Sequence, residues 1–209
     1  NVTKAIDNIS LKVDEGEFVG IMGPSGSGKT TLLNCISTID TVTTGNIIIN
    51  GKDITKLKSK KLDKFRQNEL GFIFQDFNLL DTLTAYENIA LALTIKGEKT
   101  SKIDGKIKEV AKYLGIEAIL NKYPYQMSGG QRQRVASARA IVTDPSLILA
   151  DEPTGNLDEQ TAGDIIAILK KLAKERQKCV IVVTHSKEVA EASDVVLELS
   201  RRSLVEKSK

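Results

Sequence analysis

The sequence has little cysteine and no long hydrophobic run. Cys35 and Cys179 are the two cysteines among 209 residues, and they lie in apolar segments without forming a metal-like pair. We therefore expect no disulfide framework and no zinc site, and we expect a reducing cytoplasm as the compartment. No apolar run approaches the roughly 18 residues of a membrane-spanning helix, and no charged-then-apolar leader opens the chain. Any action at a membrane is expected to be peripheral.

Charge of either sign is also not in large excess. Thirty Lys and Arg face 27 Asp and Glu, for a net charge of +3, and 41% of residues are hydrophobic. These values indicate one globular domain, too short for two tandem catalytic cassettes. One basic run stands out, and we interpret it as a solvated turn and helix start, with lipid headgroups as the alternative and no nucleic-acid partner expected. Its residues are Lys56, Lys58, Lys60, Lys61 and Lys64.

Hydrophobic periodicity predicts an α/β domain. Short apolar runs predict strands at residues 17–22, 45–50, 147–150 and 180–183. Apolar spacings of three and four predict helices at residues 31–39 and 159–177. Residues 79–142 contain several helical stretches and no convincing strand, which indicates a helical lobe inserted between the sheet-forming parts.

A glycine-rich loop lies between the first predicted strand and helix. It reads Gly23-Pro24-Ser25-Gly26-Ser27-Gly28-Lys29-Thr30 and satisfies G-x-x-x-x-G-K-[ST]. Glycines let backbone N–H groups turn inward around phosphate oxygens, and the next helix adds the positive end of its dipole. Lys29 is expected to neutralise the β- and γ-phosphates and the Thr30 hydroxyl to bind Mg²⁺. The alternative, a glycine-rich turn without a ligand, does not explain why strand, loop and helix agree.

Two carboxylates close the strand at residues 147–150. Asp151 is expected to hold Mg²⁺ directly or through water, and Glu152 is the candidate general base. Alone, such a pair is usually a solvated strand end; beside a phosphate-binding loop, catalysis is favoured.

A second candidate anion site begins at Ser128. The residues Ser128-Gly129-Gly130-Gln131 precede a basic helical stretch that runs to Ala140, so Ser128 suits a helix N-cap and the glycine N–H groups suit a terminal phosphate. An ordinary Ser cap is the alternative for this segment taken alone.

Along nearly its whole length the chain resembles the ATP-binding subunits of ABC transporters, with the motifs in the family order. The resemblance implies a P-loop NTPase fold of the ABC ATPase type, with ATP and Mg²⁺ as cofactors. It implies a RecA-like core with a small antiparallel β subdomain at residues 1–78 and 143–209, and a helical subdomain at residues 79–142, within one domain of residues 1–209.

The resemblance also assigns the motifs. Residues 23–30, with the adjoining Thr31, become the Walker A nucleotide site; residues 128–131 become the signature; residues 147–151 become Walker B. Gln75 becomes the Q-loop residue, both catalytic and a metal ligand beside Thr30 and Asp151, and His185 the switch residue at the γ-phosphate. Asn156, Leu157 and Asp158 fall in the D-loop. Without the family, Gln75 and His185 would each be interpreted as a strand-end residue.

Partners follow from the same resemblance. It implies a head-to-tail homodimer in the ATP-bound state, in which each ATP lies between Walker A of one chain and Ser128-Gly129-Gly130 of the other. A multi-span membrane permease is expected to dock near residues 75–86, where Phe77, Leu79, Leu80, Leu83 and Tyr86 are apolar and Asp76, Asn78 and Asp81 could form a rim. A core for the helical lobe is the alternative use of these apolar residues. The implied location is the cytoplasmic face of the cell membrane.

Residues 72–84, with residues 37–40, resemble the bacterial ATPases that serve antimicrobial-peptide resistance transporters of the bacitracin type. Lipoprotein release, macrolide export and a regulatory ATPase of the cell-division type are alternatives. A soluble ABC ATPase acting on nucleic acid or the ribosome is disfavoured, since coiled coils, Cys clusters and a second cassette are missing.

Two features depart from the family pattern. No aromatic residue precedes Phe18 to stack on adenine, and because the sequence begins with Asn we expect that residue to lie before position 1. Residues 200–203 replace the usual glycine-containing turn, so a longer or irregular turn is expected there.

Overall fold

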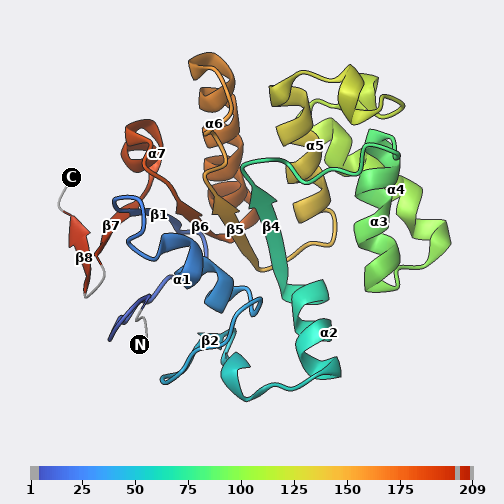
Figure 1. Ribbon diagram of the computed structural model, residues 1–209. Helices are drawn as coiled ribbons and strands as arrows, with labels where there is room; N and C mark the ends of the chain where they lie inside the picture. The colour runs from blue at the N-terminus through green and yellow to red at the C-terminus, as the bar shows by residue number, and fades with distance from the viewer. Residues whose placement is uncertain (1–4, 201–202, 208–209) are drawn as a thin grey trace.

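In the computed structural model, which describes residues 5–200 and 203–207, the chain forms a six-stranded sheet flanked by helices (Figure 1). The strand order is β4-β5-β6-β1-β7-β8. The bounds are β1 Phe18–Met22, β4 Leu70–Phe74, β5 Leu147–Asp151, β6 Cys179–Val183, β7 Val195–Ser200 and β8 Ser203–Lys207. Within the described ranges, no helix has the length and apolar character required to cross a bilayer.

Parallel pairing brings four strand ends to one edge of the sheet. Strands β4, β5, β6 and β1 pair in parallel, and one row across them contains Phe74, Asp151, Val183 and Ile21. The residue after each row member therefore lies at the carboxyl edge, where ligands bind in open α/β sheets. The segments that follow contain the glycine-rich loop, Gln75, Glu152 and His185.

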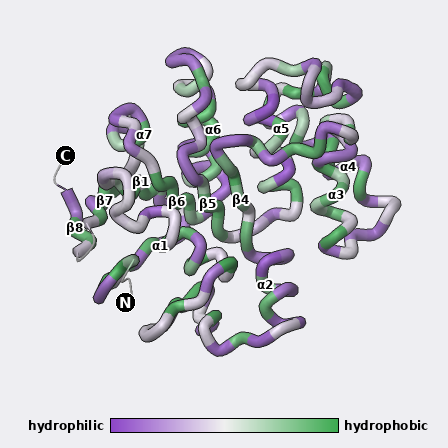
Figure 2. The backbone as a smooth tube through the Cα atoms, viewed as in Figure 1, coloured by the Kyte–Doolittle hydropathy of each residue, from purple (hydrophilic) through white to green (hydrophobic). Residues whose placement is uncertain are grey.

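Alternating side chains divide the core between the two faces of the sheet. Val19, Leu149 and Val183 pack in the cluster that contains α1 (Lys29–Ile36). Ile148, Val180 and Val182 pack in the cluster that contains α5 (Gly129–Ile141), α6 (Glu159–Arg176) and α7 (Lys187–Ala192). A period of two along each buried strand produces this division. Figure 2 shows hydrophobic residues concentrated on the central strands. The sheet is thereby held from both sides, and its carboxyl edge is left for loops.

Helix α6 (Glu159–Arg176) confirms the predicted amphipathic helix, with Ile165, Leu169 and Leu172 fully buried. Helix α1 differs from the predicted 31–39. It begins at Lys29 because Gly28 is a left-handed N-cap, and it ends at Ile36 because Thr38 has a φ of 63°. Arg66 of α2 (Lys60–Glu69) binds Thr38 through both its hydroxyl and its carbonyl, which holds the chain out of the helix.

Residues 79–142 fold as helices without a strand. Helices α3 (Ala85–Lys96), α4 (Thr100–Leu114) and α5 (Gly129–Ile141) lie together at one side of the sheet (Figure 1), and the short α7 (Lys187–Ala192) lies beside α6. Three-residue 3₁₀ turns occur at η1 (Ile54–Lys56), η2 (Glu117–Ile119) and η3 (Pro124–Gln126).

The expected strand at residues 45–50 has the wrong bounds. The predicted strand at 45–50 is only β2 (Ile48–Ile49), paired with β3 (Lys52–Asp53), because Asn50 and Gly51 both have positive φ and turn the chain. Strand β7 pairs with β8, with Ser200 opposite Ser203. The longer or irregular turn expected at residues 200–203 falls on residues 201–202, which lie outside the described residues.

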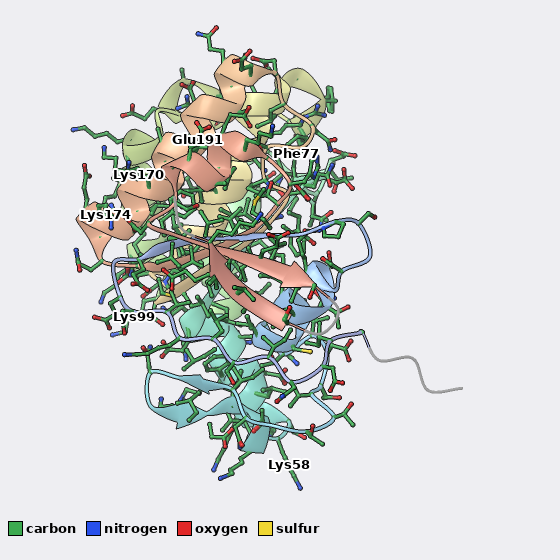
Figure 3. All side chains as sticks on the ribbon, turned by 90° about the vertical axis from the view of Figure 1, so that its left-hand side faces the viewer. Lys58, Phe77, Lys99, Lys170, Lys174 and Glu191 are labelled. Carbon is green, nitrogen blue, oxygen red and sulfur yellow. The ribbon has the colours of Figure 1, made fainter. Side chains whose placement is uncertain are left out.

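The basic run is exposed. All five of its lysines are exposed, on η1, α2 and the turn between them, as a solvated face requires. Figure 3 shows Lys58 projecting from one end of the molecule.

Candidate nucleotide site

The loop after β1 presents polar groups in the arrangement needed for phosphate. Gly28 has a φ of 99°, and a Cβ there would lie 2.6 Å from Ile6 Cγ2, so both the backbone conformation and the space require glycine. The Lys29 ammonium donates hydrogen bonds to the Gly23 carbonyl at 2.7 Å and the Pro24 carbonyl at 3.0 Å. The Ser27 hydroxyl oxygen is buried without a protein partner. A cation and a free hydroxyl at a helix N-terminus fit a phosphate.

Thr30 and Asp151 lie together although 121 positions separate them, since β1 and β5 end at the same edge. The Thr30 hydroxyl donates a hydrogen bond to the Asp151 carboxylate. Burial raises the pKa of Asp151; the Thr30 bond opposes this, the negative charge of Glu152 adds to it, and the positive charge of Lys29 opposes it. A hydroxyl and a carboxylate at one point are oxygen ligands of the type that Mg²⁺ prefers, so the residues present fit this ion.

Glu152 is held in an unusual backbone conformation. Its φ is 45°, in the left-handed region that few side chains adopt, and its N–H donates to the Val183 carbonyl. Its carboxylate accepts a hydrogen bond from the Thr184 hydroxyl at 2.9 Å and lies 2.8 Å from His185 Nδ1. Two strand ends therefore fix this carboxylate, and strain of this kind concentrates at functional sites.

Gln75 lies beside Asn156, in the segment between β5 and α6. Its amide Nε2 donates to Asn156 Oδ1 at 3.3 Å, and Asn156 Nδ2 donates to the Gln75 carbonyl and to Asp76. The structure thus joins Gln75 to Asn156 rather than to Thr30 or Asp151. Asp158 caps α6 through the Thr161 N–H and hydroxyl.

Residues 128–131 begin α5. Ser128 accepts a hydrogen bond from the Gln131 N–H, and Gln131 Oε1 accepts one from the Ser128 N–H, which completes a capping box. A Cβ at Gly130 would lie 2.3 Å from Thr161 Cγ2, so only glycine allows this approach of α5 to α6. Ser128 is therefore a true N-cap, and the N–H groups that follow it start a helix.

A groove of about 380 Å³ lies between α2, β4, α3 and α5, away from the glycine-rich loop. It is lined by Phe72 and Phe74, whose rings stack at 4.2 Å, and by Arg66, Ile95 and Arg139 among others. Ile95 is 58% exposed. The groove is thus an accessible, partly apolar surface with arginines at its border.

The apolar residues at 77–86 differ in burial. Phe77 is buried, and Leu79 and Tyr86 pack against the core, so these three serve the helical lobe; Leu80 is 47% exposed. Arg139 of α5 donates hydrogen bonds to the carbonyls of Phe77 and Asn78, both of which have positive φ.

Sequence reasoning missed Arg139, Thr184 and Gln133, a buried amide of α5 that contacts two strand ends. A signal for Gln133 exists in the sequence. It shares the buried face of α5 with Ser137 and Ala140, at spacings of four and seven, where an apolar residue would be usual.

Comparison with known proteins gives the family. The sequence profile described as ABC transporter matches residues 6–155. The chain is 54% identical over 182 residues to the ABC transporter ATP-binding protein YxdL of Bacillus subtilis (strain 168), covering 87% of this chain and 71% of YxdL. It is 50% identical over 185 residues to the bacitracin export ATP-binding protein BceA of Halalkalibacterium halodurans, covering 88% and 73%.

Solved structures agree with these relatives. The dimeric structure of MJ0796, a bacterial ABC transporter cassette, matches with a TM-score of 0.88 and 42% identity over 98% of this chain and 90% of that one. A post-hydrolysis structure of the same cassette with ADP and Pi matches with the same values.

The phosphate loop and the acidic strand end at the carboxyl edge of a parallel sheet define a P-loop nucleotide hydrolase. The chain belongs to the ABC transporter family, as an ATP-binding subunit with ATPase activity. Its cofactors are ATP and Mg²⁺, which the donor set at Lys29, Thr30 and Asp151 fits.

Proposed function

We propose that residues 23–31 bind the nucleotide phosphates and that Glu152 is the general base of ATP hydrolysis. The observation that carries the proposal is the strained, doubly held Glu152 carboxylate one residue after Asp151. Thr30, Asp151 and Gln75 would hold Mg²⁺, which screens phosphate charge when bound. For Gln75 the ligand atom would be Oε1, which takes no part in the hydrogen bond that Nε2 donates to Asn156.

In the proposed reaction, Glu152 takes a proton from water as the water oxygen attacks the γ-phosphorus and the bond to the β–γ bridging oxygen breaks. ADP and phosphate are the products. The Lys29 ammonium would exchange its hydrogen bonds to the Gly23 and Pro24 carbonyls for the phosphate oxygens, where it compensates the negative charge that develops during the reaction.

His185 has a defined part in this arrangement. When Glu152 is ionised, its Oε1 can only accept, so His185 Nδ1 carries a hydrogen and donates a hydrogen bond to Glu152 Oε1. The ring is 77% exposed, so Nε2 is free to face the γ-phosphate, and it can donate there only in the imidazolium form. His185 would thus orient the base and sense the terminal phosphate.

Two substitutions test these roles. Glu152→Gln should retain ATP binding and reduce kcat by about 10²-fold or more, because it removes the general base. Lys29→Ala should instead weaken ATP binding itself. Glu191→Gln, an exposed carboxylate of α7, is the matched control. Near-wild-type hydrolysis by the Glu152 variant would refute the base assignment.

We further propose that the working site is shared by two chains. Among the described residues, Gly129 lies against Leu157 and Gly130 against Thr161 of the same chain, Ser128 bonds to Gln131, and no hydrogen bond joins these three residues to the glycine-rich loop. A head-to-tail homodimer would place them on the partner's ATP. Light scattering of the Glu152→Gln protein should show a monomer-to-dimer shift on adding Mg²⁺ and ATP; a nucleotide-bound monomer would contradict this.

We propose the groove at Phe72, Phe74, Ile95 and Arg139 as the docking surface for a helix of a multi-span membrane permease, which would place the protein peripherally at the cytoplasmic face of the membrane. The groove extends the surface expected at residues 75–86 onto β4 and α3. Ile95→Glu should abolish copurification with a coexpressed permease encoded beside this gene, whereas exposed Glu191→Gln should not. Equal copurification by both variants would exclude this groove.

Peptide-antibiotic resistance is the proposed biological role, supported by the 50% identity to BceA. Deleting the gene should increase sensitivity to bacitracin-type peptides and not to macrolides, and the Glu152→Gln gene should fail to complement. A lipoprotein-processing or division defect without a change in peptide sensitivity would favour the alternatives instead.

A further inference from the structure

A single buried amide lies between the strand ends that carry Gln75 and Glu152. Gln133, on α5, is fully buried, and its Nε2 donates to the Pro153 carbonyl at 2.5 Å and to the Phe74 carbonyl at 3.3 Å. Phe74 directly precedes Gln75, and Pro153 directly follows Glu152. Both donor positions of this amide are therefore used beside the two residues proposed to act on water and metal.

The two carbonyls that Gln133 binds lie where β4 and β5 stop pairing. The two strands end in register, because Phe74 of β4 pairs with Asp151 of β5. Beyond this pair, regular sheet hydrogen bonding stops, and Glu152 has a positive φ. The amide of Gln133 is thus a buried side-chain bridge between the two segments after the strands end, beside the more exposed bridge from Asn156 to Gln75.

The burial of Gln133 is not explained by packing alone. Its Oε1 atom is buried without a hydrogen-bond partner, which is unfavourable, and Met has a similar size and shape without a polar group. Helix α5 contains a contrasting case in Ser137, which is also fully buried but donates only to the Gln133 carbonyl of its own helix, at 2.8 Å.

We propose that Gln133 is a positioning residue for ATP hydrolysis: it fixes the segment of Glu152 relative to that of Gln75 and connects both to the helix that Ser128 begins. The proposal rests on the general-base role proposed for Glu152. Gln133 itself does not touch nucleotide; it acts by holding the Pro153 and Phe74 carbonyls. Loss of the amide leaves the Pro153 carbonyl without its partner and the Phe74 carbonyl with the Phe77 N–H alone, and it lets Glu152 leave its aligned position.

The test compares Gln133→Met with Ser137→Ala, both in the full chain. Gln133→Met should lower kcat by about 10-fold or more, since misplacement of a catalytic group by about 1 Å can cost 10²-fold. The KM for ATP and the binding of a fluorescent ATP analogue should stay within about threefold, because the Lys29 loop is untouched. Ser137→Ala should keep kcat within about twofold while losing a buried hydrogen bond of the same helix.

A double-variant cycle separates positioning from a general loss of stability. In the Glu152→Gln background, measured by single-turnover hydrolysis, Gln133→Met should cause little further loss, because the group that it positions is gone. An equal 10-fold loss in both backgrounds, or a folded Gln133→Met protein with wild-type kcat, would overturn the proposal. If Gln133→Met does not fold, Gln133→Asn, which keeps an amide too short to reach both carbonyls, takes its place under the same criteria.

The outcomes also distinguish this proposal from the one on which it rests. Full activity of Glu152→Gln would remove the general-base assignment. Loss of activity in Glu152→Gln together with wild-type kcat in Gln133→Met would leave that assignment standing and remove only the positioning role.

Discussion

At the scale of the residue, the position of Asp151 disfavours the ionised form of its carboxyl, which is the form that would bind a metal ion. Its carboxylate is partly buried at the end of β5, next to the like charge of Glu152, and its pKa is raised mainly by burial. An oxygen ligand that is costly to ionise in the free protein is well placed to bind a divalent cation, which restores the lost solvation. Function and stability therefore make opposite demands at this position.

Asp151→Asn should abolish Mg²⁺-dependent hydrolysis and raise the Tm of the nucleotide-free protein. When folding raises the pKa of a carboxyl, its ionised form lowers the free energy of unfolding at pH values above that pKa. This destabilisation disappears as the pH falls through the raised pKa and the carboxyl becomes protonated. Solvent screening limits the gain to about 1 kcal/mol or less at pH 7, or about 2–4 °C. Thermal melting from pH 7 down toward the ordinary Asp pKa of about 3.9 should show the difference shrink. A lower Tm for the Asn variant at pH 7 would contradict the assigned penalty.

The two cysteines should be unreactive in the folded protein. Burial raises the pKa of Cys35, with the charge of Asp40 adding to it, and burial together with Glu17, Asp14 and Glu15 raises the pKa of Cys179 to about 12. Because the thiolate is the reactive form, alkylation at pH 8 should be slow in native protein and should reach two thiols only on denaturation. Fast native labelling of either thiol would show that its burial is incomplete.

At the scale of elements, the helical lobe depends on a few buried polar residues. Asn88, fully buried on α3, accepts from the Leu80 N–H and donates to the carbonyls of Leu80, Leu83 and Thr84. This one side chain shapes the loop that joins the Gln75 segment to α3. Arg139 of α5 performs the corresponding task for the Phe77 and Asn78 carbonyls.

Asn88→Ala should destabilise the protein by about 2–4 kcal/mol, because it leaves the Leu80 N–H and the Leu83 carbonyl without their side-chain partner. Exposed Asn121→Ala is the control and should change stability by less than about 0.5 kcal/mol. Urea unfolding of both variants measures the difference. A cost below about 1 kcal/mol for Asn88→Ala would mean that water replaces its hydrogen bonds.

At the scale of the whole molecule, the proposed sharing of the site between two chains predicts activity in trans. Lys29→Ala and Ser128→Arg proteins should each be inactive, whereas an equal mixture should recover up to about a quarter of wild-type activity, since half of the dimers are mixed and each has one intact shared site. Steady-state hydrolysis of the three samples provides the measurement. No recovery from two variants that remain folded would argue for a site within one chain.

The sequence by itself determined the local chemistry of this protein. The glycine-rich loop, the carboxylates after β5 and the Ser128 cap can be predicted because each depends on neighbours within a few positions: backbone freedom at glycine, a strand end, a helix start. Helix α6 was predictable for the same reason, since its apolar spacing is a local pattern.

Only the tertiary structure decided which of these groups meet. Parallel pairing aligned Phe74, Asp151, Val183 and Ile21, and this register brought Thr184 and His185 to Glu152 and Thr30 to Asp151. It also corrected the bounds of α1 and β2; after α1, the contact of Arg66 with Thr38 overrode local preference. Contacts of this kind join residues far apart in sequence, and only the packed sheet and its helices specify their distances and partners.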